Sequence, residues 1–288
     1  MSQPLLICTD LDRTLIPNGP QPESPGARAR FATLVKHPEV SLAYVSGRDR
    51  TLVQEAIGEY ELPTPAFVVG DVGTTMYRVD SGGGWQRLTE WEEDIARDWA
   101  GVGRDELRDR LVDLPGLQPQ EDTRQNVYKI SFYVSLERRG EALEEALRER
   151  LESAGVKARL IWSVDDLRGT GLLDILPARA SKYHAVDNLR SLHGLERAST
   201  VFCGDSGNDL EVLTSSIPAV LVANAKPEVR SSALRLADEA GNGELLYCAR
   251  GGFMGMNGHY SAGILEGVAH YHPHTLEWMG FDPAGSGP

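Results

Sequence analysis

The chain has 288 residues, of which 41% are hydrophobic and 25% charged, a balance typical of soluble globular proteins of about two domains. Its formal net charge of −13 argues against a nucleic-acid partner, because nucleic-acid backbones are bound by basic surfaces. It contains no apolar run of the roughly 18 residues that a membrane span requires. The sequence also shows no recognisable signal segment, so we predict a cytoplasmic protein without a membrane partner.

The first part of the chain alternates short apolar strands with helices. Strands are predicted at 5–8, 41–45 and 66–69, with one helix capped at Ser24 and a second at 51–57. This alternation is typical of a parallel, Rossmann-like α/β sheet. The carboxyl ends of parallel strands meet at one edge of the sheet, where open α/β sheets bind their ligands.

The pattern changes in the middle of the chain. A glycine-rich segment at 81–84 predicts a flexible turn or a hinge. After it come helices with aromatic or leucine stripes and three strands, predicted at 128–134, 159–163 and 172–176. We therefore predict an inserted α+β domain over 80–177, and a core domain formed by 1–79 and 178–288.

The α/β alternation returns with a helix near Lys182 and strands at 200–203 and 219–222. The glycines of the 251–258 loop lack dinucleotide-binding spacing, which argues against a nucleotide loop. We expect this loop to pack on the core; the alternatives are that it covers the site or packs on another subunit. The last nine residues, 280–288, are predicted to be disordered.

Acidic residues follow two of the predicted strands. Asp10 and Asp12 come directly after the first strand, and Asp205 and Asp209 lie on a glycine-rich turn after a later one. The second pattern alone also fits an Asx-rich turn. The two patterns together favour one shared Mg²⁺ site, because hard carboxylate and carbonyl oxygens suit this ion. We expect Asp10, the Asp12 carbonyl and Asp205 to bind the metal, and Asp209 to contact it directly or through water.

These residues have the chemistry for phosphoryl transfer. Asp10, if ionised, can attack phosphorus, and Asp12 can protonate the leaving alkoxide and later deprotonate water. The alternative role for Asp12 is only to cap the loop. Phosphoryl transfer also requires positive charge or hydrogen-bond donors around the equatorial oxygens. The residues that would supply them lie at other strand and helix ends: Ser46, Gly47, Arg48, Lys182 and Asn208.

The order of these motifs resembles the haloacid dehalogenase superfamily of Mg²⁺-dependent phosphatases. The resemblance is carried by Asp10-x-Asp12-x-Thr14, Ser46, Lys182 and Gly204-Asp205-x-x-x-Asp209. The insertion between the second and third motifs is similar to a C2-type cap of subtype B. Within the superfamily the chain is most similar to the sucrose-6-phosphate phosphatase family. That similarity includes the segments 129–131, 174–177, 203–209, 224–228 and 262–266.

The resemblance implies a sugar-phosphate phosphatase that works through a phosphoaspartate on Asp10, with sucrose 6-phosphate as the favoured substrate. Lys129 and Ser131 of the cap would contact the sugar, and Asp174 would orient a neighbouring group. Arg13 stands where the family usually has a small or amide residue. This departure leaves the identity of the sugar open. Mannosylfructose-phosphate, mannosyl-3-phosphoglycerate and kanosamine-6-phosphate are the alternatives, and a phosphomutase is a further one. The resemblance also allows a sugar-phosphate synthase or glycosyltransferase as partner, and either a monomer or a homodimer.

Overall fold

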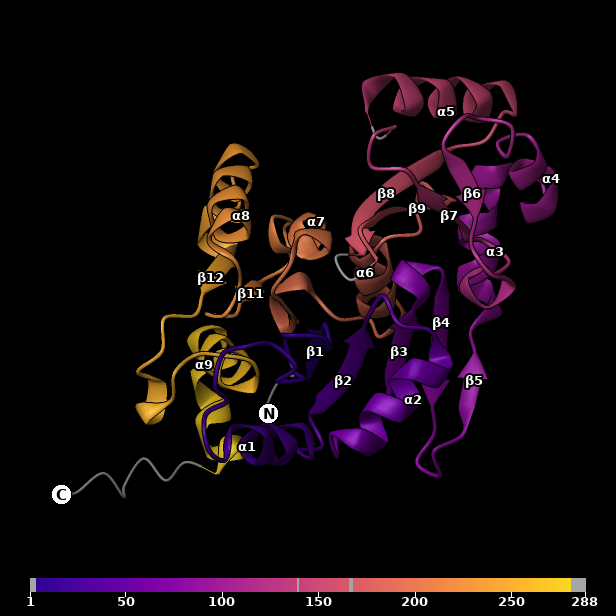
Figure 1. Cartoon of the computed structure of the whole chain (residues 1–288). Coiled ribbons are helices and arrows are strands. Elements are labelled where there is room, and N and C mark those ends of the chain that lie inside the picture. The colour runs from indigo at the N-terminus through magenta and orange to yellow at the C-terminus, as the bar shows by residue number, and fades with distance from the viewer. Residues whose placement is uncertain (1–3, 139, 166–167, 281–288) are drawn as a thin grey trace. The chain divides into compact units, whose positions relative to one another are not determined.

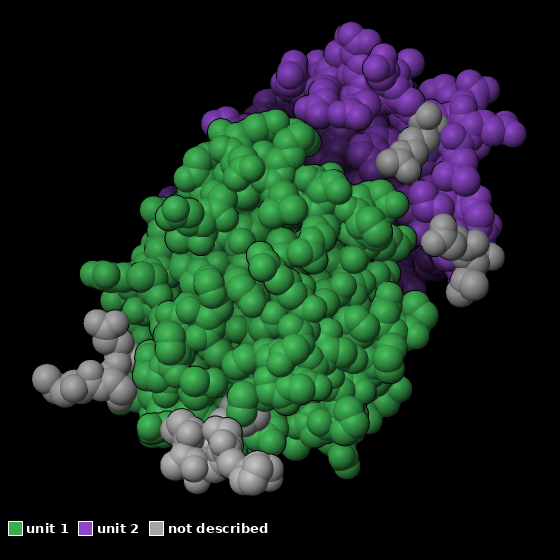
Figure 2. Space-filling view, turned by 90° about the vertical axis from the view of Figure 1, so that its left-hand side faces the viewer, with its two compact units in different colours: residues 1–87, 182–288 green, residues 88–181 purple. Residues whose placement is uncertain are grey.

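The structure is a computed structural model that describes residues 4–138, 140–165 and 168–280 (Figure 1). The chain divides into two compact units, which Figure 2 shows in different colours. The core unit comprises residues 1–87 and 182–288, and the inserted unit comprises residues 88–181. Both boundaries lie later in the chain than the predicted ones.

The first boundary differs because the glycine-rich segment is a hairpin turn. Strand β5 (Trp85–Arg87) pairs antiparallel with β4 (Thr75–Val79), so it extends the core sheet. The Asp80 N–H donates to Gly84 O at 2.9 Å, and the Gly83 N–H donates to Asp80 O at 2.9 Å. Gly83 has a φ of +81°, which glycine adopts without strain. The segment is therefore the turn that the sequence allows, and it lies within the core unit rather than at the boundary between the units.

The core unit contains an eight-stranded sheet in the order β12-β11-β10-β1-β2-β3-β4-β5. Its parallel strands are β1 (Leu5–Thr9), β2 (Val40–Val45), β3 (Phe67–Gly70), β10 (Thr200–Gly204), β11 (Ala219–Leu221) and β12 (Leu246–Cys248). This confirms the predicted α/β class. The chain leaves β1 toward β2 and β3, and after the insertion it returns on the other side of β1. Such a switch point is where open α/β sheets place ligands.

Helices cover both faces of this sheet (Figure 1). One face carries α1 (Ala27–Val35), α2 (Arg50–Glu59) and α9 (Ser261–Tyr271); the other carries α6 (Lys182–Leu192), α7 (Leu210–Leu213) and α8 (Pro227–Glu239). On the first face Ile7, Phe31 and Leu265 belong to one buried apolar cluster. Helix α1 begins after Gly26 rather than at the predicted cap, and the Ser24 hydroxyl instead accepts the Asn257 N–H at 2.9 Å.

The inserted unit contains a four-stranded antiparallel sheet in the order β6-β7-β9-β8. Its elements are α3 (Thr89–Ala96), α4 (Arg104–Asp109), β6 (Leu117–Pro119), β7 (Ile130–Val134), α5 (Glu141–Ser153), β8 (Ala158–Asp165) and β9 (Thr170–Pro177). Phe132 on β7 and Leu147 on α5 belong to its separate apolar core. Because side chains alternate along a strand, Ser131 faces the opposite side of the sheet from Phe132. This unit has the α+β character that the sequence predicts.

Short 3-10 helices fill several connections. They are η1 (Asp71–Gly73), η2 (Arg97–Trp99), η3 (Asp122–Arg124), η4 (Arg197–Ser199), η5 (Gly207–Asp209), η6 (Gly243–Leu245), η7 (Phe253–Gly255) and η8 (Pro273–Met279). Among the described residues, none of the helices is both long and apolar enough to cross a bilayer. Apart from Gly280, the tail that is predicted to be disordered lies outside the described residues.

The glycine-rich loop at 251–258 is held by a buried carboxylate of α9. Glu266 accepts hydrogen bonds from the Tyr247 hydroxyl at 2.9 Å, the Arg250 N–H at 2.9 Å and the Gly251 N–H at 3.0 Å. A Cβ on Gly258 would lie 2.7 Å from the Gly251 nitrogen, so the two ends of the loop approach more closely than a side chain allows. The loop packs on the core unit, as predicted.

Candidate active site

The two acidic motifs meet at the carboxyl ends of β1 and β10. The Asp10 N–H donates to Cys203 O at 2.9 Å, which continues the parallel pairing of these strands into the loops. Asp10, Asp205 and Asp209 are all buried, and each offers a carboxylate oxygen within 4.8 Å of the other two. The structure thus brings together three acidic residues that the sequence predicts to share one site.

Lys182 is the buried cation of this site. It is the first residue of α6, and its side chain is only 3% exposed. Its Nζ donates to Asp209 Oδ1 at 2.7 Å, to Asp10 Oδ1 at 2.9 Å and to Asn208 Oδ1 at 3.3 Å. Burial works against the charge of Lys182, but Asp10 and Asp209 raise its pKa above the usual value. The lysine is therefore protonated at physiological pH.

Asp209 holds the loop after β10 as well as the lysine. Its Oδ2 accepts the N–H groups of Asp205 at 3.1 Å and Ser206 at 3.0 Å, and the Ser206 hydroxyl at 3.2 Å. A Cβ on Gly204 would lie 2.6 Å from the Asp209 carboxyl carbon, which explains the glycine before the first aspartate. Both Asp209 oxygens already accept hydrogen bonds, so their geometry favours a positioning role over direct metal contact.

Asp205 has a charged neighbour, Arg13 Nε at 3.3 Å, but only a long hydrogen bond. Its Oδ1 lies 3.4 Å from the Thr14 hydroxyl, which also lies 3.4 Å from Asp10 Oδ2. Its Oδ2 is buried and has no hydrogen-bond partner among the described residues. Burial, with a further contribution from Asp209, raises the pKa of Asp205 to about 6. A buried cluster of acidic groups with an unsatisfied oxygen fits a divalent cation bound by oxygen ligands.

Asp12 lies at the same loop but has different partners. Arg48 donates to it through two nitrogens, Nε to Oδ2 at 2.8 Å and Nη2 to Oδ1 at 2.6 Å. The Asn18 amide donates to Asp12 Oδ1 at 2.7 Å. Partial burial would raise the pKa of Asp12, but the hydrogen bonds and charge of Arg48 outweigh it and lower the pKa. A bidentate arginine pair is a strong, directional interaction for a surface-accessible carboxylate.

This pairing adds a contact between two predicted site residues that the sequence did not indicate. Arg48 contacts the Asp12 carboxylate in this structure, and its predicted contact with the phosphate or the substrate's other oxygens stays a prediction. The Asp12 carboxylate is not among the three grouped acidic side chains. The metal ligand predicted for this residue is its backbone carbonyl, which stays a prediction. Ionised and paired, Asp12 must also exchange Arg48 for another partner before it can carry a proton.

The remaining predicted residues occupy varied positions. The Ser46 hydroxyl accepts the Arg48 N–H at 3.2 Å, and Gly47 is exposed at the tip between them. Lys129 and Ser131 belong to the inserted unit. The Ser131 hydroxyl donates to the Asp174 carboxylate, so these two residues orient each other.

Sequence reasoning missed the contacts of Asn18 and of the Arg13 side chain. Asn18 precedes Gly19 in an Asn-Gly pair, which signals a turn but not its carboxylate partner. Arg13 Nε lies 3.3 Å from Asp205 Oδ2, a pairing between residues far apart in the sequence. No local pattern indicates either interaction.

The buried carboxylates predict a pH-dependent stability. Burial raises the pKa of Asp10 from 3.8 to about 7, and that of Asp205 from 3.8 to about 6. The folded protein therefore holds these protons more tightly than the unfolded chain, and stability falls as pH rises through this range. Asp12, with its lowered pKa, acts in the opposite sense and only at lower pH. In EDTA, we expect the Tm to fall between about pH 5 and pH 8.

Differential scanning calorimetry in EDTA and in Mg²⁺ buffers checks this expectation. A divalent cation that binds only the folded state should recover the Tm most at the higher pH. A Tm in EDTA that rises or stays constant over this range would contradict it.

Comparison with known proteins identifies the family. The profile of sucrose-6F-phosphate phosphohydrolase matches residues 3–272. The chain belongs to this family. It is thus a phosphatase of the haloacid dehalogenase superfamily, as the motifs indicate. The family match agrees with the order of the motifs along the sequence, which lie at β1, β2, α6 and β10 in the structure.

The descriptions of individual relatives agree with this family assignment. A protein of Nitrosococcus oceani described as a HAD-like hydrolase is 50% identical over 279 residues, covering 97% of this chain and 75% of the relative. Sucrose-phosphatase 1 of Nicotiana tabacum is 30% identical over 277 residues, covering 93% of this chain. The chain spans only 59% of that plant protein's length.

Solved structures of two similar proteins show the same fold. The sucrose-phosphatase of Synechocystis sp., in complex with sucrose and phosphate, superposes with a TM-score of 0.69 and 25% identity, covering 94% of this chain and 98% of that one. A haloacid dehalogenase-like hydrolase of Bacillus subtilis has a TM-score of 0.63 at 18% identity and covers 93% of this chain and 92% of that one. The second match supports the fold alone.

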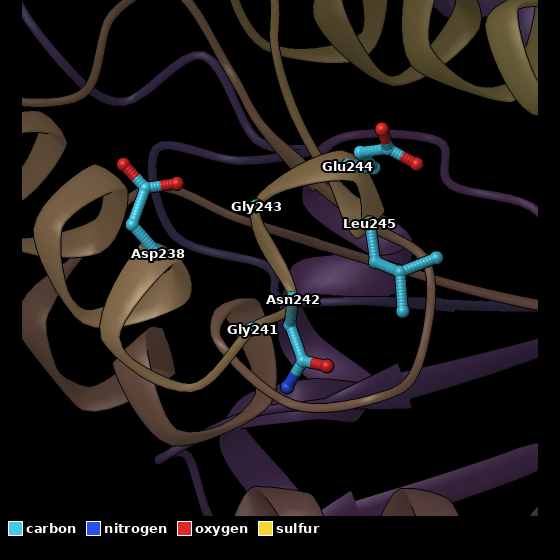
Figure 3. A pocket seen from close by; sticks show the side chains of 6 residues that line it. All are labelled: Asp238, Gly241, Asn242, Gly243, Glu244 and Leu245. Carbon is cyan, nitrogen blue, oxygen red and sulfur yellow. The ribbon is translucent and has the colours of Figure 1, made fainter.

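A surface pocket elsewhere does not belong to this site. Figure 3 shows it at the end of α8, lined by Asp238, Gly241, Asn242, Gly243, Glu244 and Leu245. Its two charged lining residues are both acidic, which is unfavourable for an anionic phosphate ester. None of its residues is a predicted site residue.

Proposed function

We propose that this protein is a Mg²⁺-dependent phosphatase that hydrolyses a sugar phosphate through a phosphoaspartate on Asp10. The observation that carries the proposal is the environment of Asp10. Its carboxylate is buried, and Lys182 Nζ donates to it at 2.9 Å beside the Asp205 and Asp209 carboxylates. A carboxylate held rigidly next to a permanent cation is arranged to meet an incoming phosphoryl group.

The reaction divides into two displacements at phosphorus. In the first, a carboxylate oxygen of Asp10 forms the new P–O bond while the bond to the sugar oxygen breaks. Asp12, which enters this step protonated after exchanging Arg48 for the substrate, gives that alkoxide its proton. In the second, Asp12 takes a proton from water, whose oxygen attacks phosphorus and releases inorganic phosphate and free Asp10. Lys182 stabilises negative charge on the transferring group throughout, because Asp10 and Asp209 keep it protonated.

Asp10, Asp205 and the Asp12 backbone carbonyl would hold the metal. When bound, Mg²⁺ supplies positive charge that reduces repulsion between the carboxylates and the phosphoryl oxygens. Asp209 supports this set by holding Lys182 and the N–H groups of the loop after β10. Asp205 Oδ2, which is buried and has no hydrogen-bond partner among the described residues, supports this assignment.

Sucrose 6-phosphate is the substrate that we favour. The family profile and the Synechocystis sucrose-phosphatase, solved with sucrose and phosphate, support a sugar or disaccharide ester. We assign sugar selection to the inserted unit, with Lys129 as the foremost candidate contact. Ser131 already donates to Asp174, so its role would be to orient that carboxylate.

A phosphate-release screen tests this function. Purified full-length protein is assayed with Mg²⁺ against sucrose 6-phosphate, mannosylfructose-phosphate, mannosyl-3-phosphoglycerate, kanosamine-6-phosphate and simple hexose phosphates. We expect the largest kcat/KM for sucrose 6-phosphate and loss of turnover in EDTA. Isomerised sugar phosphate with little free phosphate would instead show a mutase, and activity that EDTA does not change would overturn the metal requirement.

Replacing Asp12 tests its proton-transfer role. We expect Asp12→Asn to lower kcat by about 10²- to 10⁴-fold, because the amide cannot give or take a proton. With p-nitrophenyl phosphate, whose leaving group needs no proton, the variant should show a burst of nitrophenol followed by slow turnover. Rapid-mixing absorbance measures both phases. Wild-type turnover in the variant would mean that Asp12 only caps the loop.

A further inference from the structure

Arg13 lies in the loop after β1, which also carries Asp10, and it faces the Asp205 carboxylate. Its Nε lies 3.3 Å from Asp205 Oδ2, and both atoms are buried. Neither atom has a hydrogen-bond partner among the described residues, so their contact is a charge pair without good hydrogen-bond geometry. Asp205 is 2% exposed, whereas the Arg13 side chain is 33% exposed. The guanidinium can therefore move toward solvent, but the carboxylate stays buried.

The backbone of Arg13 is held in an unfavourable conformation. Its φ is +60°, in the left-handed region that non-glycine residues rarely adopt. The Arg13 N–H donates to Asn18 Oδ1 at 2.8 Å and to Ile16 O at 3.1 Å. The Arg13 carbonyl accepts a hydrogen bond from the buried Asn224 amide at 2.6 Å, and the same amide accepts the Tyr260 N–H at 2.8 Å. These bonds fix where the side chain leaves the loop, next to Asp205.

We propose that Arg13 is an internal counter-cation that competes with the metal for Asp205 and thereby sets the Mg²⁺ affinity of the site. This inference rests on the proposed function, because it concerns the same metal. A guanidinium at 3.3 Å partly neutralises the carboxylate when no metal is bound. Metal binding must then overcome repulsion from that charge or displace it, and either effect weakens the affinity.

Arg48 provides a matched control for this idea. It carries the same charge in the same site, but it pairs with Asp12, whose carboxylate is outside the grouped metal candidates. Loss of either arginine makes the site more negative and attracts a cation through the general field. Only loss of Arg13 also frees Asp205. A difference between the two variants therefore isolates the specific competition.

Isothermal titration calorimetry of Mg²⁺ into the metal-free full-length protein measures the effect. We expect Arg13→Gln to bind Mg²⁺ about tenfold more tightly than wild type, and Arg48→Gln to gain no more than about threefold. Arg13→Asn serves as a second variant that tolerates the left-handed backbone, in case the first does not fold. It should show the same gain.

Three outcomes would overturn the inference: an unchanged affinity, a weaker one, or equal gains in the Arg13 and Arg48 variants. A weaker affinity would show that Arg13 orients Asp205 for the metal instead of competing with it. If wild type and both sets of variants bind no Mg²⁺, the metal part of the proposed function fails as well. One set of titrations therefore distinguishes failure of the Arg13 inference from failure of the metal part of the proposed function.

Discussion

Asp10→Asn should reduce turnover by about four orders of magnitude or more while leaving the protein folded. The amide cannot form the acyl phosphate on which the proposed reaction depends, and loss of a covalent nucleophile costs this much or more in other enzymes. Stability should not fall with activity. Burial raises the pKa of Asp10 to about 7, so an ionised carboxylate there is destabilising, and the neutral amide removes that cost.

Two measurements check this prediction. Phosphate release gives kcat, and urea unfolding at about pH 8 gives the free energy of unfolding. Glu266→Gln is the matched control, because Glu266 is as buried as Asp10, each at 5% exposure, but belongs to the 251–258 loop anchor. We expect it to keep its kcat. Residual turnover above about a hundredth of wild type in Asp10→Asn would contradict the phosphoaspartate mechanism.

Lys182→Met should remove both activity and a large part of the stability. The lysine is the shared partner of two buried carboxylates, at 2.9 Å from Asp10 and 2.7 Å from Asp209. Removing the cation leaves both without their charge partner, and breaking a buried pair in this way costs about 3–5 kcal/mol. The lost positive charge also leaves the transferring phosphoryl group less stabilised.

The double variant Lys182→Met/Asp209→Asn separates these two effects. It removes the Asp209 carboxylate, one of the two that lose their charge partner in Lys182→Met. We therefore expect it to recover much of the lost unfolding free energy but none of the turnover. Urea unfolding in EDTA, compared with kcat in Mg²⁺, measures both quantities. A Lys182→Met protein as stable as wild type in EDTA would mean that Asp10 and Asp209 do not depend on the lysine charge.

The strand ends that form the site were predictable because their signals are local. Each buried strand is a short apolar run, and each is followed at once by its polar residues, as in Cys8 to Asp12 and Phe202 to Asp205. Parallel pairing of β1 with β10 and β2 then forces these ends to one edge of the sheet. The α/β class, the insertion and the grouping of Asp10, Lys182 and Asp205 follow from these patterns.

Tertiary structure alone decided the partners within the site. Arg48 turned out to bind Asp12, and Arg13 to face Asp205, because the loops after β1, β2 and β10 converge in space. Side-chain direction there depends on the left-handed backbone at Arg13 and on hydrogen bonds from distant residues such as Asn224. Sequence periodicity reports which residues share a face, but long-range pairing of charged side chains depends on packing and on the field of the whole site.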